Sequence, residues 1–132
     1  MQETQWDLIK VLVVDDDQTT RDIMKTFIEK IGCIGVFAEN GQKAVDILKK
    51  HHFDLCFMDI MMPVMGGVKA TQIIREEINA EIPIVAITAS TMKSDRQLCE
   101  DVGMNDYIQK PLQIQIIKDK ISHYTIQGNS LK

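Results

Sequence analysis

Apolar residues follow two patterns that alternate along the chain. In one pattern they form short continuous runs, at residues 11–14, 33–38, 55–58, 84–88 and 107–108. In the other they recur every three or four positions, as on one face of a helix, within residues 23–31, 44–48, 68–78, 94–102 and 114–124. Strands with continuous apolar runs are buried on both faces, which favours a parallel sheet covered by helices on both sides. The pattern therefore predicts an α/β protein of five strand–helix units.

Residues typical of helix ends stand at the limits of several predicted helices. Gly32 follows the first helical stripe and Asn40 precedes the second, as a C-terminal glycine and an N-cap residue would. Ser94 and Gln97 have the spacing of a capping box at the start of the fourth helix, and Gly103 ends that helix. These signals support the alternation of strands and helices.

Polar residues stand at the C-terminal ends of the predicted strands. Residues 15–17 are three aspartates after the first strand, Asp59 ends the third, Thr88 ends the fourth, and Lys110 follows the fifth. Right-handed crossovers bring these strand ends to one edge of the sheet, where folds of this kind bind ligands. Each residue alone has an ordinary structural explanation, and Asp17 is as readily a helix N-cap as a ligand. Their joint position favours a functional site.

The carboxylates expected at this edge would repel one another, and a hard divalent cation offsets such repulsion. Mg²⁺ typically binds one or two carboxylates together with water and phosphate oxygens, so the acidic group predicts a magnesium site that handles phosphate. Lys110 offers a positive charge, and Thr88 a hydroxyl donor, for phosphoryl oxygens. A carboxylate held beside these groups can attack phosphorus and form an aspartyl phosphate.

Composition argues against several other classes of function. The chain has 132 residues, of which 45% are hydrophobic and 26% charged, as expected for one soluble domain. Its net charge of −4 argues against a nucleic-acid-binding surface, which needs clustered basic residues. The apolar runs are too short to span a membrane, and the first residues lack the features of a secretory signal. Cys33, Cys56 and Cys99 are widely spaced, which fits a reduced, cytoplasmic setting.

Four segments together resemble the receiver domain of two-component response regulators. They are VLVVDDD at 11–17, DLCFMDIMMP at 54–63, IVAITA at 84–89 and DYIQKP at 106–111. The resemblance covers about residues 9–124 and implies a flavodoxin-like (βα)5 three-layer sandwich, with a five-stranded parallel sheet of order 2-1-3-4-5. We accordingly expect an N-terminal tail at 1–8, a receiver domain at 9–125 and a C-terminal tail at 126–132.

The resemblance also implies roles for the acidic residues at the sheet edge. Asp59 resembles the phosphoacceptor. Asp15 and Asp16 resemble the acidic pair that organises Mg²⁺, with Asp16 the more direct ligand and Asp59 itself part of the metal site. The backbone carbonyl of Met61 is similar in position to the family's third metal ligand.

Further roles are implied for residues of the last two strands. Lys110 resembles the lysine that pairs with the phosphoryl group, and its bond to Pro111 resembles the peptide bond that is cis in this family. Thr88 and Tyr107 resemble the switch pair, in which the hydroxyl moves toward the phosphoryl group and the aromatic ring rotates inward.

The motifs are most similar to receivers of hybrid histidine kinases and phosphorelays. The resemblance then implies a histidine kinase or a histidine phosphotransfer domain as the phosphoryl donor. It also implies a downstream protein that binds the face formed by the fourth helix, fifth strand and fifth helix, at about 94–102, 107 and 112–124. We expect no nucleic-acid or membrane partner. Such a domain is a switch that assists its own phosphorylation and dephosphorylation, rather than an enzyme.

A phosphatase of the haloacid dehalogenase type is the main alternative. The segment DDDQT at 15–19 fits the D-x-D-x-T signature of that family, with Asp15 as nucleophile and Asp17 as general acid and base. Only residues 111–132 follow Lys110, and they lack the further acidic strand which that family needs. A flavodoxin-like binding module without catalysis is a weaker alternative, because no aromatic or glycine-rich flavin loop is evident.

Overall fold

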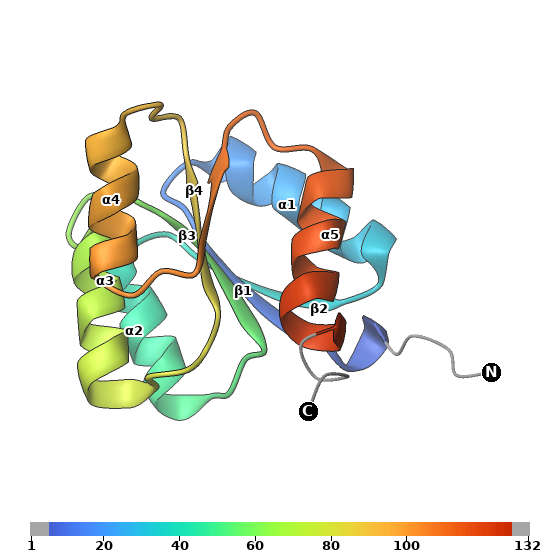
Figure 1. The fold of residues 1–132 in the computed structure, drawn as a ribbon. Helices are drawn as coiled ribbons and strands as arrows, with labels where there is room; N and C mark the ends of the chain where they lie inside the picture. The colour runs from blue at the N-terminus through green and yellow to red at the C-terminus, as the bar shows by residue number, and fades with distance from the viewer. Residues whose placement is uncertain (1–5, 128–132) are drawn as a thin grey trace.

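A five-stranded parallel sheet forms the centre of the computed structural model, which describes residues 6–127 (Figure 1). The strands are β1 (Lys10–Val14), β2 (Ile34–Ala38), β3 (Leu55–Asp59), β4 (Ile84–Thr88) and β5 (Asp106–Gln109). Their order is β2-β1-β3-β4-β5, and every neighbouring pair is parallel. The predicted (βα)5 architecture and strand order are therefore confirmed.

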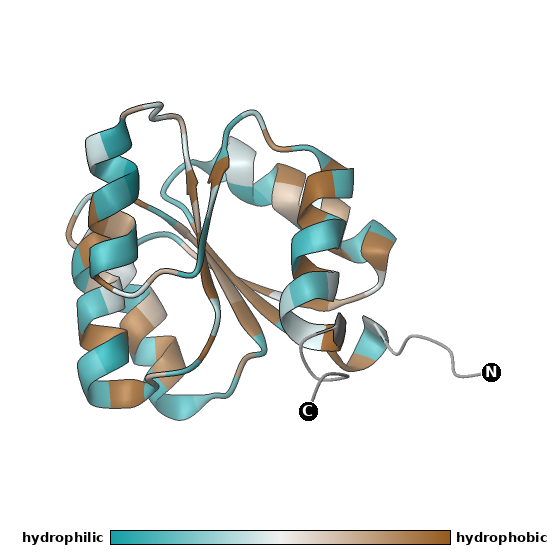
Figure 2. Cartoon of the chain, viewed as in Figure 1, coloured by the Kyte–Doolittle hydropathy of each residue, from teal (hydrophilic) through white to brown (hydrophobic). Residues whose placement is uncertain are grey.

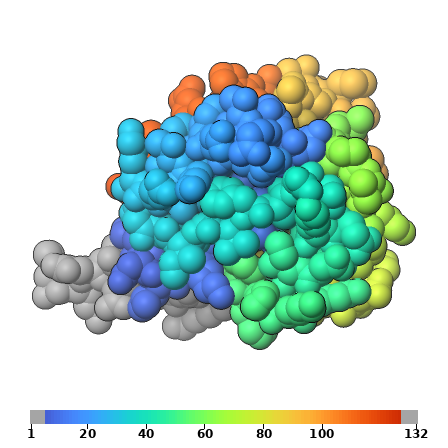
Figure 3. All heavy atoms as spheres, turned by 180° about the vertical axis from the view of Figure 1, so that it is seen from behind, coloured from blue at the N-terminus to red at the C-terminus, as the bar shows by residue number. Residues whose placement is uncertain are grey.

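Helices cover both faces of the sheet. They are α1 (Gln18–Ile31), α2 (Gly41–Lys50), α3 (Gly67–Ile73), α4 (Lys93–Asp101) and α5 (Ile114–Ile121), with π-helical turns η2 (Ile74–Ile78) after α3 and η3 (Ser122–Gln127) after α5. Helices α1 and α5 lie on one face, and α2, α3 and α4 lie on the other (Figure 1). Seen from behind, α1 (blue to cyan) and α2 (teal to green) form a continuous surface (Figure 3).

The central strands are buried on both faces, as their continuous apolar runs predict. In β1, Leu12 and Val14 belong to the core beneath α2, α3 and α4, whereas Val11 and Val13 belong to the core beneath α1 and α5. All four side chains are fully buried. Hydrophobic strands run between helices whose outer sides are hydrophilic (Figure 2). Each such side chain stabilises the fold by about 1.5–3 kcal/mol, so the two cores hold the strands, and hence the strand ends, in place.

Most helix ends follow the signals in the sequence, with one exception. Gly32 ends α1 with a φ of 100°, and the Asn40 side chain caps α2. The predicted capping box at Ser94 is wrong, because α4 begins one residue earlier and has Met92 at its N-cap position. The Met92 N–H donates instead to Ser90 Oγ, at 3.2 Å. This bond lies within the turn between β4 and α4, and no side chain caps the first turn of α4.

The first described residues are part of the folded unit. Trp6–Leu8 form a short 3₁₀ helix, η1, and Trp6 packs against the core beneath α1 and α5. The predicted tail residues 1–5 and 128–132 lie outside the described residues, and the domain limits at 9 and 125 stay a prediction. No helix within the described part of the chain has the length and apolar character needed to cross a membrane.

Candidate functional site

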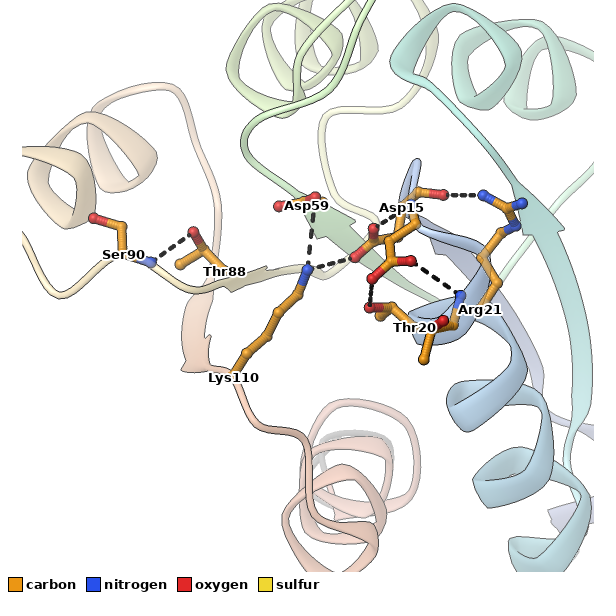
Figure 4. Close-up of polar contacts among 9 residues, drawn as sticks. Asp15, Thr20, Arg21, Asp59, Thr88, Ser90 and Lys110 are labelled. Carbon is orange, nitrogen blue, oxygen red and sulfur yellow. Dashed lines mark hydrogen bonds and ion pairs between the residues drawn. The ribbon is translucent and has the colours of Figure 1, made fainter.

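The C-terminal edge of the sheet gathers the polar residues that follow its strands (Figure 4). Asp15 comes directly after β1, Asp59 is the last residue of β3, Thr88 is the last of β4, and Lys110 comes directly after β5. The Lys110 N–H donates to the Thr88 carbonyl at 2.7 Å, which continues the pairing of β4 with β5. The parallel topology therefore places these four residues around one small volume, as predicted.

Three carboxylates form the centre of this site. Oxygen atoms of Asp15, Asp16 and Asp59 lie within 4.8 Å of one another. Asp15 is fully buried and Asp59 nearly so, whereas Asp16 is exposed. Among the described residues, the buried Asp15 Oδ2 has Lys110 as an ion-pair partner and accepts no other hydrogen bond. These are closely spaced hard oxygens, and one of them can accept a further bond. Such a set fits a small divalent cation such as Mg²⁺.

Lys110 supplies the positive charge of the site. Its Nζ lies 2.9 Å from Asp15 Oδ2 and 3.8 Å from Asp59 Oδ2. Burial by itself would lower the pKa of Lys110, but the hydrogen bond with Asp15 and the charge of Asp59 outweigh burial and raise the pKa above its usual value. The amine is therefore charged at neutral pH, next to both carboxylates, where it can also bind another anionic group.

The Asp59 carboxyl group is held where its negative charge is unfavourable. Burial, followed by the charge of Asp15, raises the pKa of Asp59 from 3.8 to about 6. Lys110 and the backbone N–H groups of Ile60 and Met61 act in the opposite direction, but they do not cancel the increase. The folded state therefore gives up stability to keep this carboxylate in place, and a cation bound beside it would return part of that stability.

Local hydrogen bonds hold the loop that follows β1. The Asp17 N–H donates to Asp15 Oδ1 at 2.9 Å, and the Asp17 side chain caps α1 by accepting from the Thr19 N–H at 3.1 Å. Asp17 is thus the helix N-cap, one of the two roles that the sequence allows. Arg21 donates through Nη1 to the Asp15 carbonyl at 2.6 Å (Figure 4). Arg21 is not among the residues predicted from the sequence, although its place one turn into the helix, four residues after the N-cap, could have indicated it.

The loop after β3 brings the start of α3 against the backbone of Asp59. A Cβ atom on Gly67 would lie 2.1 Å from the Asp59 carbonyl oxygen, so this close approach requires glycine. The Gly67 N–H also donates to the Ile60 carbonyl at 2.8 Å. The side chain of Met61 is exposed, and the role of its carbonyl as a metal ligand stays a prediction. Gly67, at the end of this loop, therefore lets the start of α3 pack against the Asp59 backbone and so helps to position Asp59.

The expected switch pair, Thr88 and Tyr107, is connected through Ser90. The Ser90 N–H donates to Thr88 Oγ1 at 3.1 Å, and the Ser90 carbonyl accepts a hydrogen bond from the Tyr107 hydroxyl at 2.7 Å. Thr88 is buried and Tyr107 is half-buried. The hydroxyl groups of Thr88 and Tyr107 are therefore linked by hydrogen bonds to one intervening residue.

The peptide bond between Lys110 and Pro111 is cis, the isomer that the resemblance implied.

Comparison with known proteins identifies the family and several sequence relatives. Residues 11–122 match the response regulator receiver domain family. The hybrid signal transduction histidine kinase K of Dictyostelium discoideum is 37% identical over 123 residues, which cover 87% of this chain and 10% of that protein. The autoinducer 2 sensor kinase/phosphatase LuxQ of Vibrio vulnificus is 38% identical over 116 residues, which cover 88% of this chain and 14% of that protein. The chain thus spans a small part of the length of these relatives.

Solved structures support the same assignment. The receiver domain of a sensor histidine kinase from Pseudomonas aeruginosa, solved with a magnesium ion coordinated in its active-site cleft, has a TM-score of 0.82 and 28% identity, covering 88% of this chain and 96% of that one. The receiver domain of Ssk1 from Saccharomyces cerevisiae, solved with the histidine phosphotransfer protein Ypd1, has a TM-score of 0.85 and 31% identity, covering 95% and 94%. Sequence, fold and the geometry of the sheet edge agree that the chain belongs to the response regulator receiver domain family.

Proposed function

We propose that this chain accepts a phosphoryl group on Asp59 from a phosphohistidine of a histidine kinase or a histidine phosphotransfer domain. The main support is the position of the nearly buried Asp59 carboxylate, which lies beside Asp15, Asp16 and the Lys110 amine. The relatives that are hybrid histidine kinases, and the neighbour solved with a phosphotransfer protein, support the choice of donor.

Asp15, Asp16 and Asp59 would hold the magnesium ion, with the Met61 carbonyl as a further ligand. When bound, Mg²⁺ supplies positive charge that offsets the carboxylates and the phosphoryl oxygens. Asp16 is the exposed member of the set, which supports its role as the more direct ligand for a hydrated ion arriving from solvent. The spare hydrogen-bonding capacity of the buried Asp15 Oδ2 supports the same site.

Asp59 acts as the nucleophile in the transfer. One of its carboxylate oxygens forms a bond to phosphorus while the P–N bond to the partner's imidazole breaks, and that electron pair leaves with the imidazole nitrogen. Lys110 binds a phosphoryl oxygen and balances its charge. The backbone N–H groups of Ile60 and Met61 hold the carboxylate in orientation. Phosphoryl transfer depends mainly on positioning and charge stabilisation, which these residues supply.

Phosphorylation then changes the surface through Thr88 and Tyr107. The Thr88 hydroxyl accepts from the Ser90 N–H in this structure, and it would turn to donate to a phosphoryl oxygen. Tyr107 responds because its hydroxyl is bound to the same residue, Ser90. The added charge shifts a pre-existing equilibrium between two arrangements, since it interacts differently with each of them.

The output surface is the face formed by α4, β5 and α5. Exposed apolar side chains on α4 and α5, among them Leu98 and Ile116, support a protein partner there. The net charge of −4 is unfavourable for nucleic acid. We place this role in the cytoplasm and describe it as a switch that assists its own phosphorylation and dephosphorylation.

The test is phosphorylation of the intact chain by acetyl phosphate with Mg²⁺, followed by mass spectrometry. We expect one added phosphoryl group, mapped to Asp59 and lost in Asp59→Asn. Asp46→Asn, which changes an exposed aspartate of α2, is the matched control and should be labelled like the wild type. Labelling that persists in Asp59→Asn and disappears in Asp15→Asn would contradict the proposal and favour the phosphatase alternative.

A further inference from the structure

Two peptide groups flank Asp16, and each of them is held by a hydrogen bond. The carbonyl of Asp15, which belongs to the peptide group before Asp16, accepts a hydrogen bond from Arg21 Nη1 at 2.6 Å (Figure 4). The N–H of Asp17, which belongs to the peptide group after Asp16, donates to Asp15 Oδ1 at 2.9 Å. The two bonds therefore fix the backbone on both sides of Asp16, and with it the direction in which the Asp16 side chain points.

The Asp16 side chain itself has no comparable support. It is exposed, and within residues 6–127 its carboxylate takes part in no hydrogen bond or ion pair. Asp15, by contrast, is fully buried and forms an ion pair with Lys110. An oxygen of Asp16 nevertheless lies within 4.8 Å of oxygens of Asp15 and Asp59. The position of this oxygen therefore depends on the backbone that carries the side chain.

Arg21 is itself anchored at the start of α1. It is the fourth residue of this helix, and its own N–H donates to the Asp17 carbonyl at 3.1 Å. Its second guanidinium nitrogen, Nη2, donates to Gln18 Oε1 at 2.7 Å, and Gln18 Nε2 donates in turn to Asp22 Oδ1 at 2.8 Å. The guanidinium group thus joins the Asp15 carbonyl to the surface of α1, through a rigid fork of donors that the ammonium group of a lysine lacks.

Arg21 also carries a positive charge next to the carboxylates of the sheet edge. A positive charge repels a cation that binds at the same edge. If Arg21 only balanced the negative charge, its removal would strengthen the binding of a cation. If Arg21 holds the backbone that carries Asp16, its removal would weaken this binding. The two roles therefore predict changes of opposite sign.

We propose that Arg21 is a positioning residue for Asp16 as a metal ligand. By holding the Asp15 carbonyl, Arg21 keeps the peptide group before Asp16 in the orientation that directs its carboxylate toward the other two carboxylates. This inference rests on the proposed function, which places Asp16 in the magnesium site. Replacing a residue that orients a metal ligand typically lowers metal affinity about 10–100-fold. Because Arg21 holds the backbone rather than the ligating group, we expect a loss of about tenfold.

The first measurement concerns the backbone and needs no metal. NMR order parameters of the backbone N–H groups are compared in the wild type, Arg21→Gln and Arg21→Lys without Mg²⁺. We expect the values of Asp16 and Asp17 to fall in both variants, because the peptide group before Asp16 is released, and those of β1 and β3 to stay unchanged. The matched control is Lys25→Gln, which removes a positive charge from an exposed position one turn further along α1 and should leave all these values unchanged. Wild-type order parameters at Asp16 and Asp17 in both Arg21 variants would overturn the proposal.

The second measurement is the affinity for Mg²⁺, followed by NMR titration of the same proteins. We expect about tenfold weaker binding in Arg21→Gln and in Arg21→Lys, and wild-type affinity in Lys25→Gln. Tighter binding in Arg21→Gln together with wild-type binding in Arg21→Lys would show that Arg21 only balances charge, and would overturn the proposal. Wild-type affinity in both Arg21 variants, or a tenfold loss in Lys25→Gln as well, would also overturn it.

The Asp16→Asn variant tests whether Arg21 acts through Asp16. In this background, Arg21→Gln should weaken Mg²⁺ binding by about twofold or less, because the ligand that Arg21 positions has been removed. A full tenfold loss in this background would show that Arg21 acts independently of Asp16, contrary to the proposal. A wild-type chain that fails to bind Mg²⁺ would instead contradict the proposed function, and the metal-free NMR comparison would still decide whether Arg21 holds this peptide group.

Discussion

Lys110 lies beside the nearly buried Asp59 and Lys120 beside the half-buried Asp106, yet these two carboxyl groups have opposite pKa shifts. Asp106 receives hydrogen bonds from Lys120 at 2.6 Å, from the Tyr124 hydroxyl at 3.0 Å and from the Tyr107 N–H at 2.8 Å. Burial by itself would raise the pKa of Asp106, but these donors outweigh it and lower the pKa. At the sheet edge, by contrast, Lys110 is shared between two carboxylates, and the pKa of Asp59 is raised to about 6.

The difference lies in burial and in the charges around each carboxylate: burial and the charge of Asp15 raise the pKa of Asp59, whereas hydrogen-bond donors outweigh burial at Asp106. Three donors surround Asp106, so this cluster fastens the start of β5 to the end of α5 and to η3. The sheet edge has three carboxylates and one lysine, which leaves negative charge uncompensated. The cluster around Asp106 stabilises the fold. The carboxylates at the sheet edge lower its stability, at a place where their negative charge can bind a cation and react with a phosphoryl group.

Removing each lysine should give the largest contrast. Lys110→Met leaves the fully buried Asp15 carboxylate without its ion-pair partner, so we expect a loss of about 2–4 kcal/mol in the free energy of unfolding at pH 7. Lys120→Met should cost about 1–2 kcal/mol, because Asp106 keeps two other donors and is partly hydrated. Urea unfolding without Mg²⁺, followed by circular dichroism, measures both. Equal losses would contradict the explanation by burial and neighbouring charge.

Replacing each aspartate by asparagine should change stability in opposite directions. Asp59→Asn removes an unfavourable charge and should raise the free energy of unfolding by about 1–2 kcal/mol at pH 7 without Mg²⁺. Asp106→Asn removes a favourable charge and should lower it by about 1 kcal/mol, since the cluster is only partly buried. The same unfolding assay tests both variants. The gain in Asp59→Asn should shrink when Mg²⁺ is added, because the ion stabilises only the wild type at this position.

The pH dependence of stability should separate the two carboxyl groups. For Asp59 the folded pKa is above the unfolded value, so its contribution is favourable at low pH and is lost as the pH rises from about 4 to about 6. For Asp106 the folded pKa is below the unfolded value, so its contribution is present above pH 4 and is lost as the pH falls further. Difference curves of wild type against Asp59→Asn and Asp106→Asn, measured by urea unfolding across this range, should have opposite slopes. Curves of the same slope would refute the assignment.

The smallest effect is expected for the Tyr124 hydroxyl. Tyr124→Phe removes one of the three donors to Asp106 and should lower the free energy of unfolding by about 0.5–1 kcal/mol. Titration of Asp106 by NMR should show its pKa moving back toward the usual value, while the titration of Asp59 stays unchanged. An unchanged pKa of Asp106 would show that Lys120 and the backbone alone account for the shift.

The fold and the membership of the site follow from the sequence. Continuous apolar runs separated by helical stripes specify strands buried on both faces, and parallel strands linked by right-handed crossovers must end at one edge. This topology predicts that Asp15, Asp59, Thr88 and Lys110 lie together, and the structure places them around one volume.

How each group in that volume is held depends instead on tertiary packing. Burial and side-chain directions determine three features: the raised pKa of Asp59, the hydrogen bond from Arg21 to the Asp15 carbonyl, and the stack of Arg96 on Tyr107. The capping prediction at Ser94 failed because α4 begins at Lys93, so that Ser94 lies inside the first turn of the helix. Sequence periodicity records which face a residue occupies, whereas interaction energies depend on distances of a few ångströms that only packing sets.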